Sequence, residues 1–157
     1  MTRTHKENNV KTLNVLLIGN NPIELSAILS KLNQITSTKV ITEIAFDLKS
    51  VLERLMKFRP NYILIDDNLN KVEFSSAMQV ISENSKTRNV PVAVLKNSNY
   101  NEANGSNLFA DYLLKANLTA ESIYKAFRNS LRMRRTQALI LKSLRKQKRN
   151  FSLTNIW

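Results

Sequence analysis

The sequence predicts an α/β fold in which a five-stranded parallel sheet is covered by helices on both faces. Five short apolar runs that end in turn residues recur along the chain, as expected for strands buried on both sides. Between these runs, apolar residues recur at spacings of three and four, the pattern of a helix packed through one face. Because strands and helices alternate, we expect a flavodoxin-like, doubly wound sheet with strand order 2-1-3-4-5.

The first two strand–helix units are predicted within residues 15–55. The first strand, Val15–Ile18, is followed by Asn21, which suits a helix cap, and by Pro22, which suits the first helical turn. The second strand covers residues 40–46 and is rich in β-branched side chains. The apolar faces of the two helices consist of Leu25, Ile28, Leu29 and Leu32, and of Leu48, Val51, Leu52 and Leu55.

The remaining units extend to residue 131. Strands are predicted at residues 62–65, 91–95 and 111–114. A helix over residues 97–107 would have few apolar positions, because this stretch is rich in Asn and Ser and contains Gly105. The last helix is predicted to begin near Thr119. The faces of the other two helices consist of Phe74, Ala77, Met78 and Ile81, and of Ala120, Ile123, Tyr124, Phe127 and Leu131.

The formal net charge of +12 is concentrated in the C-terminal part of the chain. Residues 1–13 carry +2, residues 14–127 carry +1, and residues 128–157 carry +9 without any acidic residue. This last stretch also lacks Gly and Pro, which favours a helix that continues the preceding one without a break. We therefore predict a flexible N-terminal arm (residues 1–12), a domain (residues 13–131) and a basic helical extension (residues 132–157).

The composition argues against several classes of function. The chain has no cysteine and one histidine, His5, which excludes thiolate chemistry and argues against a histidine-based catalytic or zinc site. No apolar run approaches the ~18 residues of a membrane span, and the polar start does not resemble a signal peptide, so we expect a cytoplasmic protein. Gly19 and Gly105 form no glycine-rich phosphate loop, which argues against a nucleotide or flavin binder.

Polar residues follow the predicted strands at the edge where parallel strands end. They are Gly19, Asn20 and Asn21 after the first strand, Asp66 and Asp67 after the third, Lys96 and Asn97 after the fourth, and Lys115 after the fifth. Because the carboxyl ends of these strands meet at one edge of the sheet, we expect a charged crevice there. Polar residues at strand ends also begin ordinary loops, and spacing alone does not separate the two interpretations.

The order of these residues resembles the receiver domains of two-component response regulators, from about Val15 to Leu131. Asp66 falls on the family's phosphoacceptor aspartate, Lys115 on its lysine, and Tyr112 on its aromatic switch position. The resemblance implies a signalling module that accepts a phosphoryl group from a histidine kinase, with Mg²⁺ neutralising the charge. For Tyr112, a half-buried strand tyrosine is an equally good interpretation.

Several positions in the same crevice depart from that family. Gly19 and Asn20 replace the acidic pair that follows the family's first strand, so the carboxylates that Mg²⁺ prefers are missing there. Lys96 stands where the family has a small hydroxyl residue at a switch position, and its ammonium could form an ion pair with Asp66. We therefore hypothesise a degenerate pseudo-receiver that keeps the fold, loses phosphorylation and needs no cofactor.

The alternative hypothesis keeps phosphorylation. In that case Asp67 replaces the missing carboxylates as a Mg²⁺ ligand beside Asp66, and the chain is a working response regulator in a phosphorelay. Under either hypothesis we expect an interaction module of a signalling pathway and not an enzyme. The predicted pocket consists of Asp66, Lys115, Lys96, Asp67, Asn20 and Asn21.

Three interpretations of the basic extension remain open. As a signalling helix it would form a homodimer and lead to a partner or an attached output domain. Two apolar sets have spacings of three, four or seven, but neither persists over three heptads: Leu131, Ala138 and Leu141, and Met133, Ile140 and Leu144. Its lysines and arginines could instead bind nucleic acid or anionic lipid, although only Trp157 could stack on bases. In the third interpretation it is a solvated helix that packs its apolar stripe on the domain. Residues 151–157 resemble the start of a further element, so the chain could be part of a longer protein.

Overall fold

The structure is a computed structural model that describes residues 12–97 and 110–154. Its strands are β1 (Thr12–Ile18), β2 (Lys39–Ala45), β3 (Tyr62–Asp66), β4 (Val92–Lys96) and β5 (Ala110–Leu114). Its helices are α1 (Pro22–Asn33), α2 (Leu48–Lys57), α3 (Lys71–Glu83) and α4 (Ala120–Thr154), with a short 3-10 helix at Lys115–Asn117. The strands are parallel and follow the order β2-β1-β3-β4-β5, which confirms the predicted fold class.

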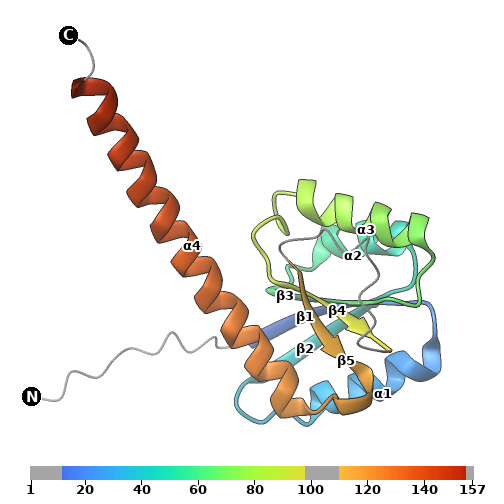
Figure 1. The fold of residues 1–157 in the computed structure, drawn as a ribbon. Coiled ribbons are helices and arrows are strands. Elements are labelled where there is room, and N and C mark those ends of the chain that lie inside the picture. The colour runs from blue at the N-terminus through green and yellow to red at the C-terminus, as the bar shows by residue number, and fades with distance from the viewer. Residues whose placement is uncertain (1–11, 98–109, 155–157) are drawn as a thin grey trace, which may run out of the picture.

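Helices cover both faces of the sheet (Figure 1). The first part of α4 and α1 lie on one face, and α2 and α3 lie on the other. Along β3, Tyr62 and Leu64 belong to the core under α1 and α4, whereas Ile63 and Ile65 belong to the core under α2 and α3. Every residue of β3 is buried, because a central strand with helices on both sides has no face turned to water. The strand therefore delivers Asp66 to the sheet edge from inside a dry core.

Side-chain caps begin the helices that follow the first three strands. Asn21 accepts a hydrogen bond from the backbone N–H of Glu24 at 3.3 Å, which confirms the cap predicted for α1. Asp47 and Ser50 form a reciprocal capping box at the start of α2, and Asn70 caps α3. Each cap fixes the residue at which its helix begins, and the caps of α1 and α3 thereby fix the length of the loops beside the carboxyl ends of β1 and β3.

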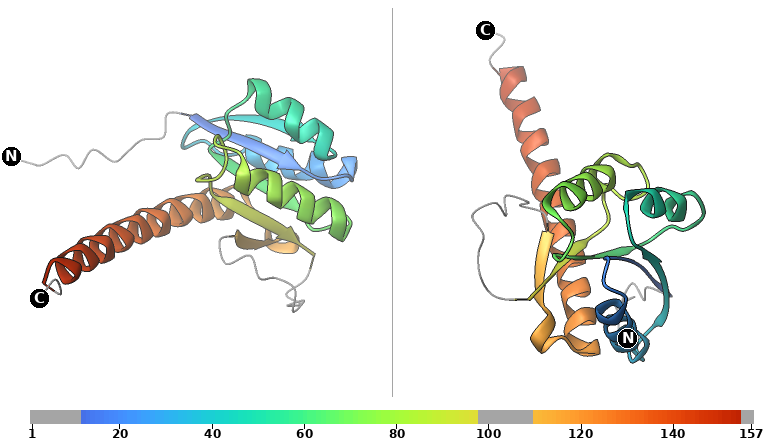
Figure 2. Two further views of the ribbon diagram at one scale, coloured as in Figure 1. Left: turned by 90° about the horizontal axis from the view of Figure 1, so that it is seen from above. Right: turned by 90° about the vertical axis from the view of Figure 1, so that its right-hand side faces the viewer.

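The helix α4 has 35 residues, which corresponds to about 50 Å, and its two parts have different surroundings. Ile123, Phe127 and Ser130 are buried against the domain. From Arg132 onward the helix leaves the domain, as both views in Figure 2 show, and most of its described side chains are exposed. The predicted continuation of the last helix into the basic extension is thus confirmed.

The N-terminal boundary of the sheet differs from the prediction. β1 begins at Thr12, which pairs with Lys39 of β2, so Thr12 belongs to the sheet and not to the predicted arm. The rest of that arm, and nearly all of the helix predicted over residues 97–107, lie outside the described residues. Within residues 12–97 and 110–154, no helix is both long enough and apolar enough to cross a membrane.

Candidate functional site

Asp66 is the central residue of the candidate site. Its side chain is fully buried (0% exposed) at the carboxyl end of β3. Its Oδ1 accepts a hydrogen bond from the backbone N–H of Asn68 at 3.0 Å and another from Lys115 Nζ at 2.5 Å. Among the described residues, its Oδ2 has no hydrogen-bond partner. The sequence therefore correctly predicted that Asp66 and Lys115 meet at the sheet edge.

The ammonium of Lys115 is surrounded by three carboxylates. Lys115 directly follows β5, and its Nζ lies 2.5 Å from Asp66 Oδ1, 3.0 Å from Glu24 Oε2 and 3.8 Å from Asp67 Oδ1. The side chain of Lys115 is only 13% exposed, so these interactions form in a poorly solvated place where charge–charge attraction is strong. One cation thus partly offsets the charge of three carboxylates from two separate segments of the chain.

Glu24 is a site residue that the sequence analysis missed. It lies in the first turn of α1, where the Asn21 cap turns the helix start toward the sheet edge. Its Oε2 accepts hydrogen bonds from Lys115 Nζ at 3.0 Å and from Asn68 Nδ2 at 2.6 Å. A carboxylate in the first turn of the helix after β1 was the available signal, since such a residue lies above the strand ends. Glu24 thus returns a negative charge to a crevice whose first strand ends in Gly19 and Asn20.

The pKa values of these groups shift in opposite directions. Hydrogen bonding to Lys115 lowers the pKa of Glu24 below its ordinary 4.5, against the opposing effect of burial. Burial raises the pKa of Asp66 above 3.8, and this effect outweighs the hydrogen bonds from Lys115 and Asn68. Burial alone would lower the pKa of Lys115, but hydrogen bonds to Asp66 and Glu24 hold it above 10.5. Lys115 is therefore a permanent cation at neutral pH.

Gly19 leaves no room for a side chain at the end of β1. A Cβ atom at this position would lie 2.8 Å from Leu25 Cδ2 and 3.1 Å from Asp66 Cβ. Leu25 is buried in the core under α1, so it cannot move aside without loosening that core. The space that a carboxylate at residue 19 would need is thus taken by the packing of α1 against β3.

Asn20 and Asn21 lie elsewhere than predicted. We expected both to line the pocket, but the side chain of Asn21 accepts hydrogen bonds from the N–H groups of Ile23 and Glu24 as the cap of α1. Asn20 is exposed at the end of β1. The reason is that a free first turn of a helix offers several unpaired N–H groups, which bind a nearby amide oxygen in preference to a distant cation.

Lys96 also departs from the prediction. Instead of pairing with Asp66, its Nζ lies 4.0 Å from the centre of the Tyr112 ring on the neighbouring strand. Tyr112 is 45% exposed, so this cation–π contact lies at the surface and not in the pocket. Lys96 and Tyr112, the two positions expected to correspond to the family's switch residues, thus contact each other directly. Asp67, by contrast, lies in the predicted pocket beside Lys115.

A search for related proteins gives structural relatives only. No protein-family model matches the sequence, and no curated protein matches it. This chain is similar to the receiver domain of a sensor histidine kinase from Pseudomonas aeruginosa, which was solved with a magnesium ion in its active-site cleft. The TM-score is 0.59 and the identity 20%, over 75% of this chain and 96% of that one. A chemotaxis response regulator of Vibrio cholerae is similar with a TM-score of 0.60 and 20% identity, over 76% of this chain and 98% of that one. The chain has the receiver-domain fold.

A further relative extends past the receiver fold. It is a yeast Spc42 trimeric coiled coil, residues 181–211, fused to another structure, with a TM-score of 0.58 and 18% identity. The match covers 92% of this chain and 99% of that one. Residues 12–131 make up only about three quarters of the chain, so this match includes part of α4 beyond the domain.

The residues of this receiver fold do not fit a magnesium ion. Mg²⁺ needs oxygen ligands that surround one point, but here the carboxylates of Asp66, Glu24 and Asp67 all converge on the ammonium of Lys115. In the part of the chain that the structure describes, no three acidic or histidine side chains are arranged to hold a metal ion. A divalent cation beside Asp66 Oδ2 would also face the positive charge of Lys115 at close range.

Proposed function

We propose that this chain is a phosphorylation-independent, receiver-like signalling module that acts through protein contacts and is not an enzyme. The observation that supports this most directly is the position of Lys115 Nζ among three carboxylates, 2.5 Å from the aspartate that corresponds to the family's phosphoacceptor. In this proposal Lys115 permanently supplies the positive charge that Mg²⁺ would otherwise bring to the carboxylates. The chain is thus a degenerate member of the receiver family.

The state of Asp66 supports the same proposal. Phosphoryl transfer to a carboxylate requires an exposed nucleophilic oxygen and a cation that neutralises the developing charge. Asp66 is fully buried, and its Oδ1 already accepts two hydrogen bonds. Burial also raises its pKa, because the charged carboxylate is disfavoured where solvation is poor. Restoring a carboxylate at Gly19 would require Leu25 to move.

The experiment that tests this proposal is a titration with beryllofluoride and Mg²⁺, observed by amide NMR on the full chain. We expect no saturable shifts at Asp66, Asp67, Asn68 or Lys115, because no vacant metal position faces Asp66. The variant Asp66→Asn serves as the control for nonspecific effects of the reagents. Saturable shifts in the natural chain that are absent from this control would show a working phosphoacceptor.

The second candidate is a working response regulator, phosphorylated on Asp66 by a histidine kinase. One observation favours it: Asp66 Oδ2 and Asp67 Oδ1 are buried and, among the described residues, lack hydrogen-bond partners. Two adjacent carboxylate oxygens of this kind could become ligands of Mg²⁺ if Lys115 moved away from Asp66. The same beryllofluoride titration decides between the two candidates, because only the working regulator requires that movement.

The proposal includes a homodimer formed through α4, which would connect the module to a partner or to an attached output domain. Met133, Ile140 and Leu144 are 58%, 53% and 54% exposed, although they are apolar, and their spacing places them on one face of the helix. We call this face the α4 seam. Its neighbours Thr136, Gln137 and Ser143 are uncharged, which lowers the like-charge repulsion between two helix segments that each carry +9. The match to a trimeric coiled-coil fusion supports association through α4 but does not fix the number of copies.

A further inference from the structure

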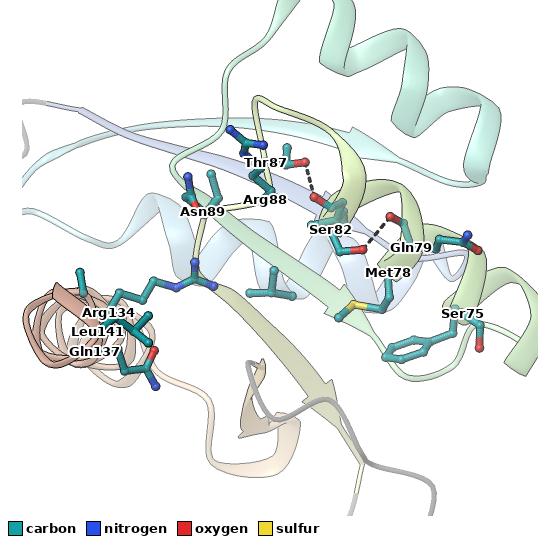
Figure 3. A pocket seen from close by; sticks show the side chains of 15 residues that line it. Ser75, Met78, Gln79, Ser82, Thr87, Arg88, Asn89, Arg134, Gln137 and Leu141 are labelled. Carbon is teal, nitrogen blue, oxygen red and sulfur yellow. Dashed lines mark hydrogen bonds between the residues drawn. The ribbon is translucent and has the colours of Figure 1, made fainter. Parts of the chain in front are cut away.

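A wide groove lies between α3 and the middle of α4, over the start of β4 (Figure 3). Its volume is about 1010 Å³. Figure 3 shows Arg134 and Leu141 on the α4 side, opposite Met78 and Ser82 of α3. This groove is separate from the crevice around Asp66, because β4 begins at the opposite edge of the sheet from the carboxyl end of β3.

The floor and one wall of the groove are apolar. Phe74 and Met78 on α3 are partly buried, and Ile81 and Val92 lie beneath them in the core. On the other wall Leu141 is 55% exposed, which is unfavourable for a large aliphatic side chain that nothing in the described structure covers. A surface of this kind is typical of a site that receives apolar side chains from a partner.

The charges around the groove have a single sign. Arg88 and Arg134 line it, and none of the residues that line it is acidic. In residues 12–97 and 110–154, neither arginine has a carboxylate within ion-pair distance. Arg134 is partly buried, and burial lowers the pKa of its guanidinium against the opposing effect of Asp111. Arg134 is thus partly desolvated and Arg88 is exposed, and both can bind the carboxylates of a partner.

We infer that this groove docks an acidic amphipathic helix of a partner protein. The lining of α3 from Phe74 to Ser82 spans about 12 Å, which matches two turns of a docked helix with apolar anchors at i, i+3 or i+4, and i+7. The flanking arginines would then bind carboxylates on the sides of that helix. The inference deepens the proposed function, on which it rests, because it names the kind of protein that the module contacts.

A second copy of this chain is a poor occupant of the groove. Its own exposed helix segment, residues 128–157, carries +9 and no acidic residue, so it would be repelled by Arg88 and Arg134. The α4 seam also faces a different direction. Met133 of the seam directly precedes Arg134 of the groove, and Ile140 directly precedes Leu141. One position along a helix corresponds to a rotation of about 100° around its axis. The two faces are adjacent and share Gln137 at their border, so dimerisation and docking use largely different residues of α4.

The test is a titration of the full chain with a synthetic peptide of about four helical turns, with leucines on one face and glutamates on the other, observed by amide NMR. We expect saturable shifts at Met78, Ser82, Val90 and Leu141. The double variant Arg88→Glu and Arg134→Glu should bind about tenfold more weakly or worse. The matched control, Arg132→Glu with Arg135→Glu, makes the same charge change at exposed positions of α4 outside the groove and should bind within about threefold of the natural chain.

A second pair of variants tests the apolar contact. Leu141→Ser should weaken peptide binding about tenfold, whereas Leu139→Ser, at a more exposed leucine outside the groove, should leave it unchanged. Equal losses of affinity in both charge variants would show that the peptide binds the basic helix through nonspecific attraction, which would overturn the inference. The inference would also be overturned if no shifts appeared at millimolar peptide. The same holds if nuclear Overhauser contacts joined the groove to residues 98–109 in the free chain. The beryllofluoride result is independent of all these outcomes, so the two proposals can fail separately.

Discussion

Lys115 provides the central positive charge of the carboxylate pocket, since its ammonium lies within 4 Å of Asp66, Glu24 and Asp67. We expect Lys115→Met to lower the free energy of unfolding at pH 7 by about 3 kcal/mol, because it leaves a buried carboxylate without its cation. Urea denaturation measures this loss. The control is Lys125→Met, at an exposed lysine near the start of α4. It should change the free energy of unfolding by less than about 0.5 kcal/mol.

A double variant separates the lost ion pair from lost packing. In Lys115→Met with Asp66→Asn, no unpaired charge remains at the fully buried position, so about half of the lost stability or more should return. Glu24 and Asp67 are about one-third exposed and can be solvated once the lysine is gone. A double variant as unstable as Lys115→Met alone would mean that the methylene chain of Lys115, and not its charge, stabilises the pocket.

The raised pKa of Asp66 predicts an unusual pH dependence. Because the folded state binds this proton more tightly than the unfolded state, Asp66 stabilises the fold as the pH falls through its raised pKa toward 3.8. Glu24 acts in the opposite direction, since its lowered pKa gives stability that is lost below 4.5. We therefore expect the natural chain to gain stability relative to Asp66→Asn between pH 7 and pH 4. A constant difference in denaturation experiments over this range would contradict the raised pKa.

At the residue scale, the sequence revealed charges but not the directions of the side chains that carry them. Asp66 ends the buried strand β3 and Lys115 directly follows β5, so the parallel sheet alone brings them to one edge. Glu24 depends on how α1 is capped, and Lys96 on the pairing of β4 with β5, which places it beside Tyr112. Such side-chain positions are fixed by tertiary geometry, which no local pattern encodes.

At the scale of elements, the α4 seam has a direct consequence for assembly. Ile140→Asp together with Leu144→Asp should abolish the homodimer, because two buried carboxylates in each helix would face one another in a coiled coil. Sedimentation velocity over a range of protein concentrations measures the effect and also gives the number of copies. The control is Leu139→Asp, a 68% exposed leucine outside the seam, which should leave the association unchanged. A natural chain that stays monomeric at millimolar concentration would rule the seam out.

The elements themselves were predictable because each has a strong local pattern. β3 and β4 are continuous apolar runs, and α1 begins at the capping residue that was predicted from the sequence. The groove between α3 and α4 could not be predicted in this way. Its walls, near residues 74–82 and 134–141, are separated by more than fifty positions along the chain, so their proximity follows only from the folded arrangement.

For the whole molecule, the nearly neutral domain and the strongly basic helix have separate physical properties. Residues 14–127 carry a net charge of +1, whereas residues 128–157 carry +9. Ile123 and Phe127, near the start of α4, pack into the core of the domain under α1. The later residues of α4 extend away from the domain. Contacts that maintain the fold and charges that attract partners are therefore carried by different parts of the same helix.

This separation predicts the effect of removing residues 132–157. The shortened chain keeps Ile123, Phe127 and Ser130 in their buried positions, so its free energy of unfolding in dilute solution should change by less than about 1 kcal/mol. It should lose the concentration-dependent dimer, since the α4 seam is gone. It should also lose any affinity for duplex DNA that falls steeply with added salt, because that affinity requires the basic helix. A shortened chain that still dimerises would place the interface on the domain itself, where Tyr112 and Lys96 form an exposed contact at the edge strand β5.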